Sequence, residues 1–360
     1  MKFVFRADSS IDIGSGHVMR CLTLASYLVG KGHECYFVCR AHQGNIIDLV
    51  IQRGFTVFTL PRVTELMARE QKLFHSHWLG VSQKTDVEQT ILALETNRIL
   101  PDWLVVDHYA LDEDWQVLFS RQYPTAKILV IDDLGDRNHQ CDLLVDQNLD
   151  ASSEKYQSRV TTTRTQILAG VEYALLRPEF VLWRVKSLAR RAKPELKEIL
   201  LNLGGIDKDN LTGQILQALE KANLPSDLHI TVIMGKTAPH IAQVKALAQQ
   251  SRLNINVFVN VSNMAELMSN ADLAIGAAGS TSWERCCLGL PTLLVVLAEN
   301  QNKIAQSLEV SNIAKIVTVK NIAEIIQGLT LETLKVMSGK SSSLVDGLGC
   351  QKIVDRMYEL

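Results

Sequence analysis

The residues best suited to chemistry lie in one short stretch near the start of the chain. An apolar run, 2–5, leads through polar residues to Gly14-Ser15-Gly16-His17, and segment 18–29 then shows helical apolar spacing. A strand, a glycine loop and a helix start together present free backbone N–H groups and a positive helix end, which bind anions. Gly14 and Gly16 permit a tight turn and close approach of a ligand. We therefore predict that His17 faces whatever this loop binds.

His17 is a candidate general base, because an imidazole can accept a proton from water near neutral pH. A lone surface histidine is the alternative. Asp8, in the same loop, is expected to hold the imidazole tautomer or a sugar hydroxyl, and a solvated loop aspartate is the alternative. Tyr109 ends a predicted strand after Asp107-His108, which favours a phenol at the ligand-binding edge as much as a core tyrosine.

A second motif lies at Gly276-Ala277-Ala278-Gly279-Ser280-Thr281-Ser282-Trp283-Glu284. It has the pattern of a strand, a small-residue turn and a helix start with three hydroxyls, which suits a diphosphate. Gly279, Ser280 and Thr281 would surround the phosphates. Glu284, one helical turn further on, would accept hydrogen bonds from ribose hydroxyls. The alternative is a simple helix cap with Ser280 or Thr281 at the cap and Glu284 near its third position.

Polar residues at predicted element starts complete the candidate site. Arg177 precedes Pro178 and a helix, which suits a fixed guanidinium on a phosphate or uracil edge, or a linker salt bridge. Asn300 and Gln301 begin a helix, where they would contact sugar or phosphate, or cap the helix. Gly204 and Gly205 form a turn in the second half equivalent to that at Gly14 and Gly16.

Composition narrows the class of protein. The chain has 360 residues, of which 47% are hydrophobic and 21% charged, with a net charge of -2. This is an ordinary globular composition, and the charge gives no reason to expect a nucleic-acid or membrane partner. Seven cysteines lack metal-ligand spacing and mostly lie in apolar segments, which indicates reduced core thiols, no metal cofactor and a cytoplasmic protein. A monomer is the expected state.

Strand-like and helix-like segments alternate along the whole chain, which predicts an α/β fold of two doubly wound, Rossmann-like domains facing an interdomain cleft. We expect a catalytic N-terminal domain over 1–178, a nucleotide-binding domain over 195–335 and a helical segment over 336–360. The strands predicted from apolar runs are 2–6, 34–39, 56–60, 103–107, 127–132, 143–145, 198–203, 229–234, 254–259, 273–275, 292–296 and 314–319. The helices predicted from apolar spacing are 16–30, 44–53, 84–98, 114–121, 179–192, 210–221, 241–250, 264–270, 280–288 and 301–310.

Two common nucleotide motifs are missing from the chain. The first glycine loop lacks the third glycine of GxGxxG, and the strand 34–39 does not end in the acidic residue that holds an adenosine ribose. No Walker sequence occurs. NAD and ATP are therefore only minor alternatives, and we expect no cofactor.

The segment around Glu284 resembles the nucleotide-sugar site of GT-B glycosyltransferases, especially the peptidoglycan lipid-intermediate N-acetylglucosaminyltransferase. With Arg6-Ala7-Asp8-Ser9-Ser10, His17 and Arg20, the chain is similar to the UDP-sugar hydrolases of pseudaminic acid biosynthesis. Further matching patches spread over 1–305 and are Asp107-His108-Tyr109, Ile131-Asp132-Asp133, Asp146-Gln147-Asn148, Leu168-Ala169-Gly170, Tyr173-Ala174-Leu175-Leu176-Arg177-Pro178-Glu179-Phe180, Leu203-Gly204-Gly205-Ile206-Asp207 and Ala298-Glu299-Asn300-Gln301.

The resemblance implies an enzyme of surface glycan synthesis that removes UDP from UDP-2,4-diacetamido-2,4,6-trideoxy-β-L-altropyranose. Water would attack the anomeric carbon without a metal. The resemblance also implies that Arg20 belongs to the substrate site and that the backbone at Met234 seats the uracil. Two alternatives stay open: a GT-B glycosyltransferase that uses a UDP-sugar donor, and a noncatalytic nucleotide-sugar-binding protein of polysaccharide assembly.

Overall fold

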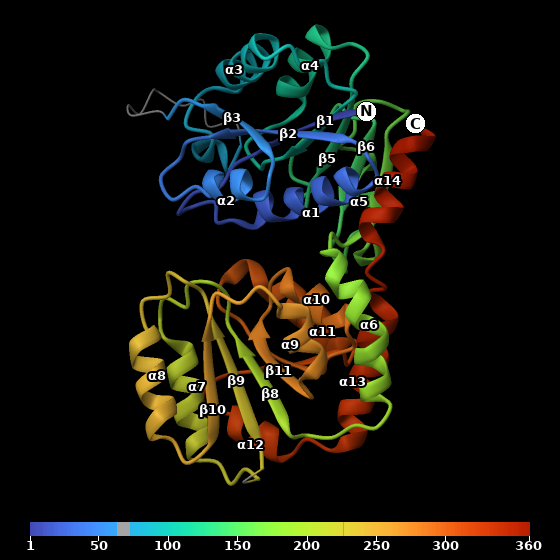
Figure 1. Ribbon diagram of the computed structural model, residues 1–360. Helices are drawn as coiled ribbons and strands as arrows, with labels where there is room; N and C mark the ends of the chain where they lie inside the picture. Colours follow the sequence, from blue (N-terminus) through green and yellow to red (C-terminus); the bar gives the residue numbers. More distant parts are fainter. Residues whose placement is uncertain (63–72, 226) are drawn as a thin grey trace. The chain divides into compact units, whose positions relative to one another are not determined.

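The computed structural model describes residues 1–62, 73–225 and 227–360, and it divides the chain into two compact units (Figure 1). Unit 1 consists of Met1–Leu176 together with Leu348–Leu360. Unit 2 consists of Arg177–Gly347. Each unit is built on one parallel sheet with helices on both faces, which confirms the predicted class of two Rossmann-like domains.

Unit 1 contains a seven-stranded parallel sheet with the order β3-β2-β1-β4-β5-β6-β7. Its strands are β1 Lys2–Ala7, β2 Glu34–Arg40, β3 Thr56–Leu60, β4 Trp103–Asp107, β5 Lys127–Ile131, β6 Leu143–Asp146 and β7 Gln166–Ala169. The central strand β4 is buried along its whole length, as expected for a parallel strand covered on both faces. The sequence pattern predicts six of these strands and misses β7, which is only four residues long and half-buried.

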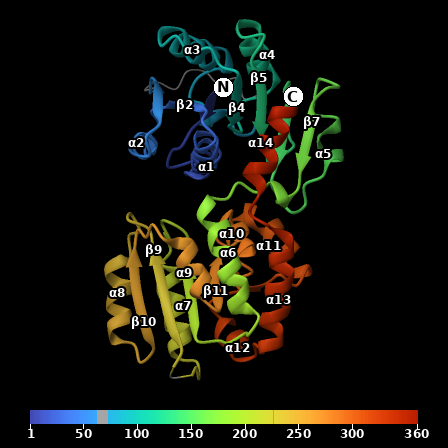
Figure 2. The same cartoon turned by 45° about the vertical axis from the view of Figure 1, so that its right-hand side comes forward.

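Helices cover both faces of this sheet, with α1 and α2 on one side and α3 and α4 on the other in Figure 1. The helices of unit 1 are α1 Gly16–Gly30, α2 Ile47–Gln52, α3 Gln83–Thr96, α4 Glu113–Gln122, α5 Ser153–Gln157 and α14 Gly349–Glu359, with the short 3-10 turns η1 Ser76–Trp78 and η2 Val171–Tyr173. The apolar face of α14 enters the same core as α1, although α14 is the last element of the chain (Figure 2).

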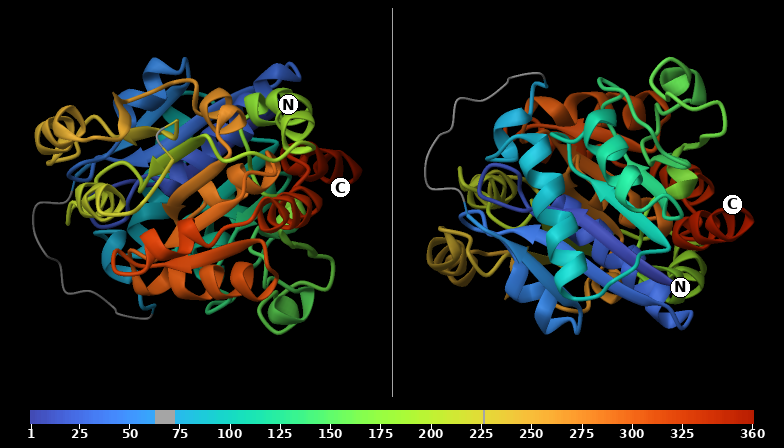
Figure 3. Two further views of the ribbon diagram at one scale, coloured as in Figure 1. Left: turned by 90° about the horizontal axis from the view of Figure 1, so that it is seen from below. Right: turned by 90° about the horizontal axis from the view of Figure 1, so that it is seen from above.

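The C-terminal segment predicted over 336–360 is therefore not one body. Helix α13, Leu331–Leu344, belongs to unit 2, whereas α14 belongs to unit 1. The side chain of His33 contacts both chain ends: its Nδ1 lies 3.5 Å from the Met1 amino group, and its Nε2 lies 2.5 Å from the Tyr358 hydroxyl. The N and C labels accordingly lie near each other in both views of Figure 3.

Unit 2 contains a six-stranded parallel sheet with the order β10-β9-β8-β11-β12-β13. Its strands are β8 Glu198–Asn202, β9 His229–Met234, β10 Asn254–Val259, β11 Leu273–Ala277, β12 Thr292–Val295 and β13 Ala314–Val317. Every one of them overlaps a strand predicted from the sequence. The first strand of each unit lies inside its sheet and leads into a glycine loop, so both loops emerge at a carboxyl edge.

The helices of unit 2 are α6 Pro178–Arg191, α7 Leu211–Glu220, α8 Ile241–Gln250, α9 Met264–Asn270, α10 Thr281–Cys287, α11 Asn302–Val310, α12 Ile322–Gln327 and α13, with the 3-10 turn η3 Glu299–Gln301. Buried side chains of α7, α8 and α12 form one core with the sheet. Elsewhere α6 packs against α9 and α10, and α10 packs against α13. This packing fixes α10, which follows the proposed diphosphate loop.

Candidate functional site

The first candidate site lies at the carboxyl edge of unit 1, where β1 and β4 are neighbours in parallel register and Ala7 lies opposite Asp107. The loop after β1 turns at Gly14, whose φ of 76° is a left-handed conformation that favours glycine. It then enters α1 with His17 in the first turn. The imidazole Nδ1 of His17 lies 2.6 Å from Oδ1 of Asp107. Two strands that are far apart in the sequence thus bring a histidine and a carboxylate into contact.

The carboxylate of Asp107 is fully buried and has a second partner. Arg20, one turn along α1 from His17, donates from Nε to Oδ2 at 2.6 Å and from Nη2 to Oδ1 at 2.7 Å. Burial opposes ionisation of Asp107, but the charges of Arg20 and then His17 outweigh it and hold its pKa well below the usual range. Asp107 is therefore ionised near neutral pH, and an ionised carboxylate accepts a hydrogen bond from the Nδ1–H of His17. The lone pair then lies on Nε2.

Nε2 of His17 has no hydrogen-bond partner among the residues that the structure describes. The side chain is 9% exposed, so the free nitrogen lies in a largely enclosed place. The backbone N–H groups of Gly16, His17 and Val18 likewise have no partner in the described ranges, because Ser15 caps α1 without a side-chain bond. This edge of unit 1 therefore presents a base and three backbone donors together.

Tyr109 joins the same cluster, but through a different carboxylate. Its hydroxyl donates to Oδ2 of Asp133 at 2.6 Å, and Nη1 of Arg20 donates to the same oxygen at 2.6 Å. Burial, followed by the charge of Asp133, raises the pKa of Tyr109 well above its usual value. The ring of Tyr109 meets the imidazole of His17 edge-on at 4.5 Å between centroids. Tyr109 is thus a neutral hydrogen-bond donor that packs against the base.

Aromatic side chains from η1 border this cluster. Trp78 stacks on Tyr109 with centroids 5.7 Å apart and lies 6.2 Å from His17, while His75 lies 4.2 Å from Trp78. The sequence gives no signal for His75 or Trp78, because this loop shows neither helical nor strand periodicity. Flat aromatic faces beside a base suit the apolar face of a sugar ring.

Asp8 does not have the place predicted for it. It is fully buried and accepts two hydrogen bonds from Arg6, from Nη1 at 2.6 Å and from Nη2 at 2.9 Å. The backbone N–H of Arg40 and the imidazole Nε2 of His108 also lie at its oxygens, at 2.7 Å and 3.2 Å. The prediction that Asp8 holds the imidazole of His17 is therefore wrong, and Asp107 has that position. The reason is local, because Arg6 and Asp8, two residues apart, pair with each other.

Asp8 belongs to a buried ion network beneath the edge. Asp86 accepts from Nε of Arg6 at 3.0 Å, from Nη2 of Arg40 at 2.6 Å and from Nε1 of Trp115 at 3.0 Å. Burial opposes ionisation of Asp8 too, but the charge of Arg6 holds its pKa well below the usual range. This network fixes the end of β1 and therefore the start of the loop that carries His17.

The second candidate site lies in unit 2, where β11 runs through 278–280 into α10. Gly279 and Thr281 are half-buried and Ser280 is exposed, so these three can meet a ligand. Ser282 is buried, and its hydroxyl accepts from Nη2 of Arg285 at 3.0 Å. The structure thus offers two of the three predicted hydroxyls at this surface.

Glu284 lies on the first turn of α10 and is paired with Arg177. Nη2 of Arg177 lies 3.4 Å from Oε1 of Glu284, and Nη1 of the same guanidinium lies 2.8 Å from Oε1 of Glu179. Burial raises the pKa of Glu284, and the charge of Arg177 partly opposes this rise. Arg177 forms the salt bridge that the sequence left as its alternative role, and this salt bridge includes the carboxylate predicted to bind ribose.

Glycines bring two further loops of unit 2 together. Gly204, with a φ of 96°, and Gly205 follow β8, and a Cβ at Gly235 would collide with the carbonyl group of Gly205. The side chain of Met234 is buried and its carbonyl oxygen accepts from Asn260 N at 2.9 Å. Only backbone at this position can therefore meet a ligand, as the uracil prediction requires.

Gln301 and Asn300 lie in η3. The side-chain oxygen of Gln301 accepts from the backbone N–H of Leu297 at 3.0 Å, so it closes its own loop and does not cap α11. The side chain of Asn300 lies outside the described part of the structure. In the described ranges no group of three or more His, Cys, Asp or Glu side chains is arranged to hold a metal ion. None of the helices described there is long and apolar enough to span a membrane.

Comparisons with known proteins point to nucleotide-sugar enzymes. A model of the glycosyltransferase family 28 C-terminal domain matches residues 199–344. The chain is 26% identical over 305 residues to an uncharacterized protein of Methanocaldococcus jannaschii, which covers 84% of this chain and 56% of that protein. It is 25% identical over 305 residues to the UDP-2,4-diacetamido-2,4,6-trideoxy-beta-L-altropyranose hydrolase of Campylobacter jejuni, which covers 85% of this chain and 95% of the hydrolase.

Among solved structures, MurG of Acinetobacter baumannii aligns over the full length of both chains with a TM-score of 0.71 and 16% sequence identity. The fold of this chain is therefore that of the GT-B proteins, as the sequence predicts. The name of the Campylobacter relative describes a UDP-sugar hydrolase, whereas the matching family model describes a glycosyltransferase domain.

Proposed function

We propose that this protein is a hydrolase that removes UDP from UDP-2,4-diacetamido-2,4,6-trideoxy-β-L-altropyranose. The single observation that carries the proposal is the 2.6 Å contact between Nδ1 of His17 and Asp107, which leaves Nε2 as a proton acceptor at a carboxyl edge. The similarity to the Campylobacter hydrolase over 95% of its length supports the choice of substrate.

In the proposed reaction, Nε2 of His17 accepts a proton from water as the water oxygen bonds to the anomeric carbon. The bond between that carbon and the diphosphate oxygen breaks, and the electron pair leaves with UDP. The free sugar keeps the oxygen of water, with inversion at the anomeric carbon. Asp107 holds the imidazole in the right tautomer and stabilises the imidazolium that forms. A general base of this kind contributes a rate factor of roughly 10²–10⁴.

The nucleotide half of the substrate belongs to unit 2 in this proposal. The loop before α10 would bind the diphosphate through Gly279, Ser280 and Thr281, while Glu284 would accept hydrogen bonds from ribose hydroxyls. A diphosphate bound by such donors is a good leaving group, because its growing negative charge is stabilised as the bond breaks. We expect no metal to take part, and we expect a cytoplasmic monomer.

A glycosyltransferase that uses a UDP-sugar donor is the second candidate, and the match to the family 28 domain over 199–344 supports it as well. The two functions differ in what attacks the anomeric carbon. A hydrolase needs water alone, whereas a transferase needs the hydroxyl of an acceptor. A protein that only binds the nucleotide sugar would need no base. The binding role therefore does not explain why His17 is held by a buried carboxylate.

The test is incubation of the purified protein with the UDP-linked diacetamido sugar in H₂¹⁸O, without an acceptor and with EDTA in a parallel sample. The proposal expects UDP release in both samples and ¹⁸O in the free sugar, not in UDP. UDP release only after addition of an acceptor would replace the hydrolase by the transferase. Loss of activity in EDTA that Mg²⁺ or Mn²⁺ restores would contradict the metal-independent mechanism.

A further inference from the structure

Arg285 has a position that the mechanism above does not use. It follows Glu284 in α10, and its side chain is among the largest fully buried ones of the protein, with the residue 2% exposed. Arginine is rarely buried without a carboxylate, because removing its charge from water is costly unless that charge is paired. Among the described residues no carboxylate forms an ion pair with Arg285, and the neighbouring carboxylate of Glu284 bonds to Arg177 instead.

Among the described residues, the guanidinium bonds to neutral oxygens in and beside the proposed diphosphate loop. Nη2 donates to the carbonyl oxygen of Ala277 at 2.7 Å and to the hydroxyl of Ser282 at 3.0 Å, and Nη1 donates to the hydroxyl of Thr281 at 3.2 Å. A Cβ at Gly276 would collide with this guanidinium, so the glycine makes room for it. Arg285 therefore lies directly beneath the loop.

These bonds orient a hydroxyl toward a ligand. Thr281 is half-buried and its oxygen accepts from a cationic N–H group, so its own O–H is left to donate. A hydroxyl whose oxygen accepts from a cation is a stronger donor, and an anion is the acceptor that benefits most from it. The hydroxyl of Ser282 accepts from Arg285 in the same way, but it is buried. Of these two hydroxyls, only that of Thr281 can therefore reach a ligand.

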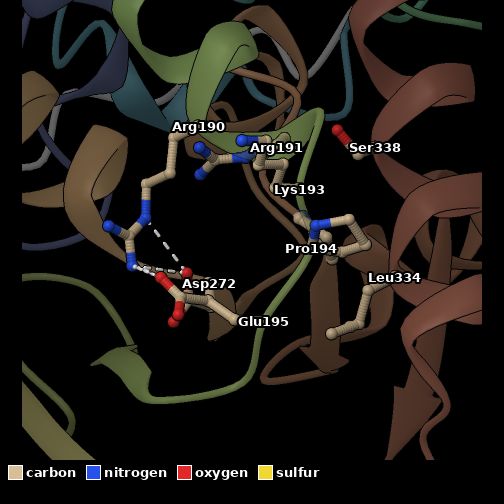
Figure 4. Close-up of a pocket in the computed structure, with 9 residues that line it drawn as sticks. Arg190, Arg191, Lys193, Pro194, Glu195, Asp272, Leu334 and Ser338 are labelled. Carbon is tan, nitrogen blue, oxygen red and sulfur yellow. Dashed lines mark hydrogen bonds and ion pairs between the residues drawn. The ribbon is translucent and has the colours of Figure 1, made fainter.

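Arg191 is a second buried arginine of unit 2, and its charge is compensated in a way that the charge of Arg285 is not. Figure 4 shows it beside Arg190, whose guanidinium pairs with Asp272 and Glu195. Arg191 donates instead to the carbonyl oxygens of Met268 and Ala271, at 3.0 Å and 2.9 Å. These carbonyls lie at the C-terminal end of α9, where the helix dipole is negative and offsets a positive charge.

Arg285 lacks this compensation, because the oxygens that it reaches lie at the end of β11, at Ala277, and in the first turn of α10, at Thr281 and Ser282, where the helix dipole is positive. Burial lowers the pKa of both arginines to about 10, so both stay charged at neutral pH. Among the described residues, the charge of Glu284 acts on Arg285 but no carboxylate forms an ion pair with it. An arriving anion would stabilise a charge held in this way at a positive helix end.

We propose that Arg285 is a positioning residue and that the diphosphate of the bound nucleotide is its counter-charge. Its bond to Thr281 makes the Thr281 hydroxyl a hydrogen-bond donor to that phosphate. The inference rests on the proposed function only in taking UDP as the nucleotide. In this proposal, the buried side chain of Arg285 makes the protein bind a nucleoside diphosphate more tightly than the nucleoside.

The test compares the affinities of UDP and uridine by calorimetry for wild-type protein, Arg285→Met and Arg285→Lys. We expect Arg285→Met to weaken UDP binding at least tenfold and uridine binding less than twofold, and Arg285→Lys to recover part of the loss. The matched control is Arg191→Met, which removes an equally buried charge and should leave the UDP-to-uridine ratio of affinities unchanged.

A second variant keeps the inference testable if Arg285→Met folds poorly. Thr281→Val removes the hydroxyl and leaves the arginine in place, and it should reduce UDP affinity without affecting uridine. Equal losses for UDP and uridine, or an unchanged UDP affinity in Arg285→Met and Thr281→Val, would overturn the inference. Absence of UDP binding by the wild-type protein would instead refute the proposed function, so the two failures are distinguishable.

Discussion

The carboxylate of Asp107 accepts a 2.6 Å hydrogen bond from Nδ1 of His17. The same carboxylate accepts two hydrogen bonds from Arg20, from Nε and from Nη2. The carboxylate therefore has one permanently charged partner, Arg20, beside the imidazole of His17. Arg20 keeps Asp107 ionised whether or not the imidazole carries a proton, so His17 can gain and lose its proton without loss of its orienting partner. This arrangement suits a base that is used once in every turnover.

Replacement of Asp107 tests the orienting role. Asp107→Asn keeps the shape of the side chain but can donate to Nδ1, which would place the proton on Nε2. We expect kcat for UDP release to fall by roughly 10²–10⁴, with KM nearly unchanged, because a base is lost while binding groups remain. Steady-state kinetics measure this, with the exposed Asp48→Asn as control. An unchanged kcat would show that the contact with His17 plays no part in the reaction.

Asp8 should affect stability instead of chemistry. Asp8→Asn leaves the buried charge of Arg6 with one carboxylate fewer, and breaking a buried pair costs about 3–5 kcal/mol. The folded pKa of Asp8 is depressed, so its stabilisation is present above the unfolded value of about 3.9 and is lost as pH falls toward the folded value.

Denaturant unfolding between pH 7 and pH 3 measures this effect. The difference in unfolding free energy between wild-type protein and Asp8→Asn should be largest near neutral pH and should shrink below about pH 4. Asp355→Asn, an exposed change on α14, should show no such trend. A difference that stays constant over this range would mean that Asp8 does not contribute through its charge.

Glu284 should determine the affinity for the nucleoside part of UDP. Glu284→Gln loses charge-assisted hydrogen bonds to ribose worth roughly 1.5–3 kcal/mol, which is about ten- to a hundredfold in Kd for UDP. Calorimetry against Glu179→Gln is a matched comparison, because both carboxylates pair with Arg177. Similar effects of the two variants would assign the loss to Arg177 and not to ribose contact.

The pH dependence of binding provides a further check on this residue. Burial raises the pKa of Glu284, so its carboxylate gains a proton at a higher pH than an exposed glutamate does. UDP affinity should therefore decrease as pH falls through this raised value, and the decrease should be absent in Glu284→Gln.

The sequence alone predicted the parts of this protein that depend on neighbouring residues. Apolar runs located the described strands except β7, and Gly14 and Gly16 located the turn that begins α1, because these signals lie within a few residues. The pairing of His17 with Asp107 was not predictable in this way. It depends on β1 and β4 becoming neighbours, and 90 residues separate the two side chains in the chain.

Asp8 shows how short-range reasoning fails at a site. It lies close to His17 in the chain, but Arg6, two residues before it at the end of β1, pairs with it instead. The proposed role of Arg285 could not be predicted from the sequence either, because an arginine in a helix is normally expected to be exposed. A strand-end carboxylate such as Asp107 was the one available signal, because parallel strands bring their carboxyl ends to one edge.

The role of His17 as the base is tested by a single-turnover comparison of wild-type protein and His17→Asn with the UDP-linked diacetamido sugar, without acceptor. The Kd of UDP is measured for both proteins. We expect His17→Asn to lower the rate of UDP release by roughly 10²–10⁴ while the Kd of UDP stays within about twofold, and a control change, His240→Asn, to alter neither. A His17→Asn protein that releases UDP at the wild-type rate, or that loses rate and UDP affinity in equal measure, would contradict the assignment of His17 as the base.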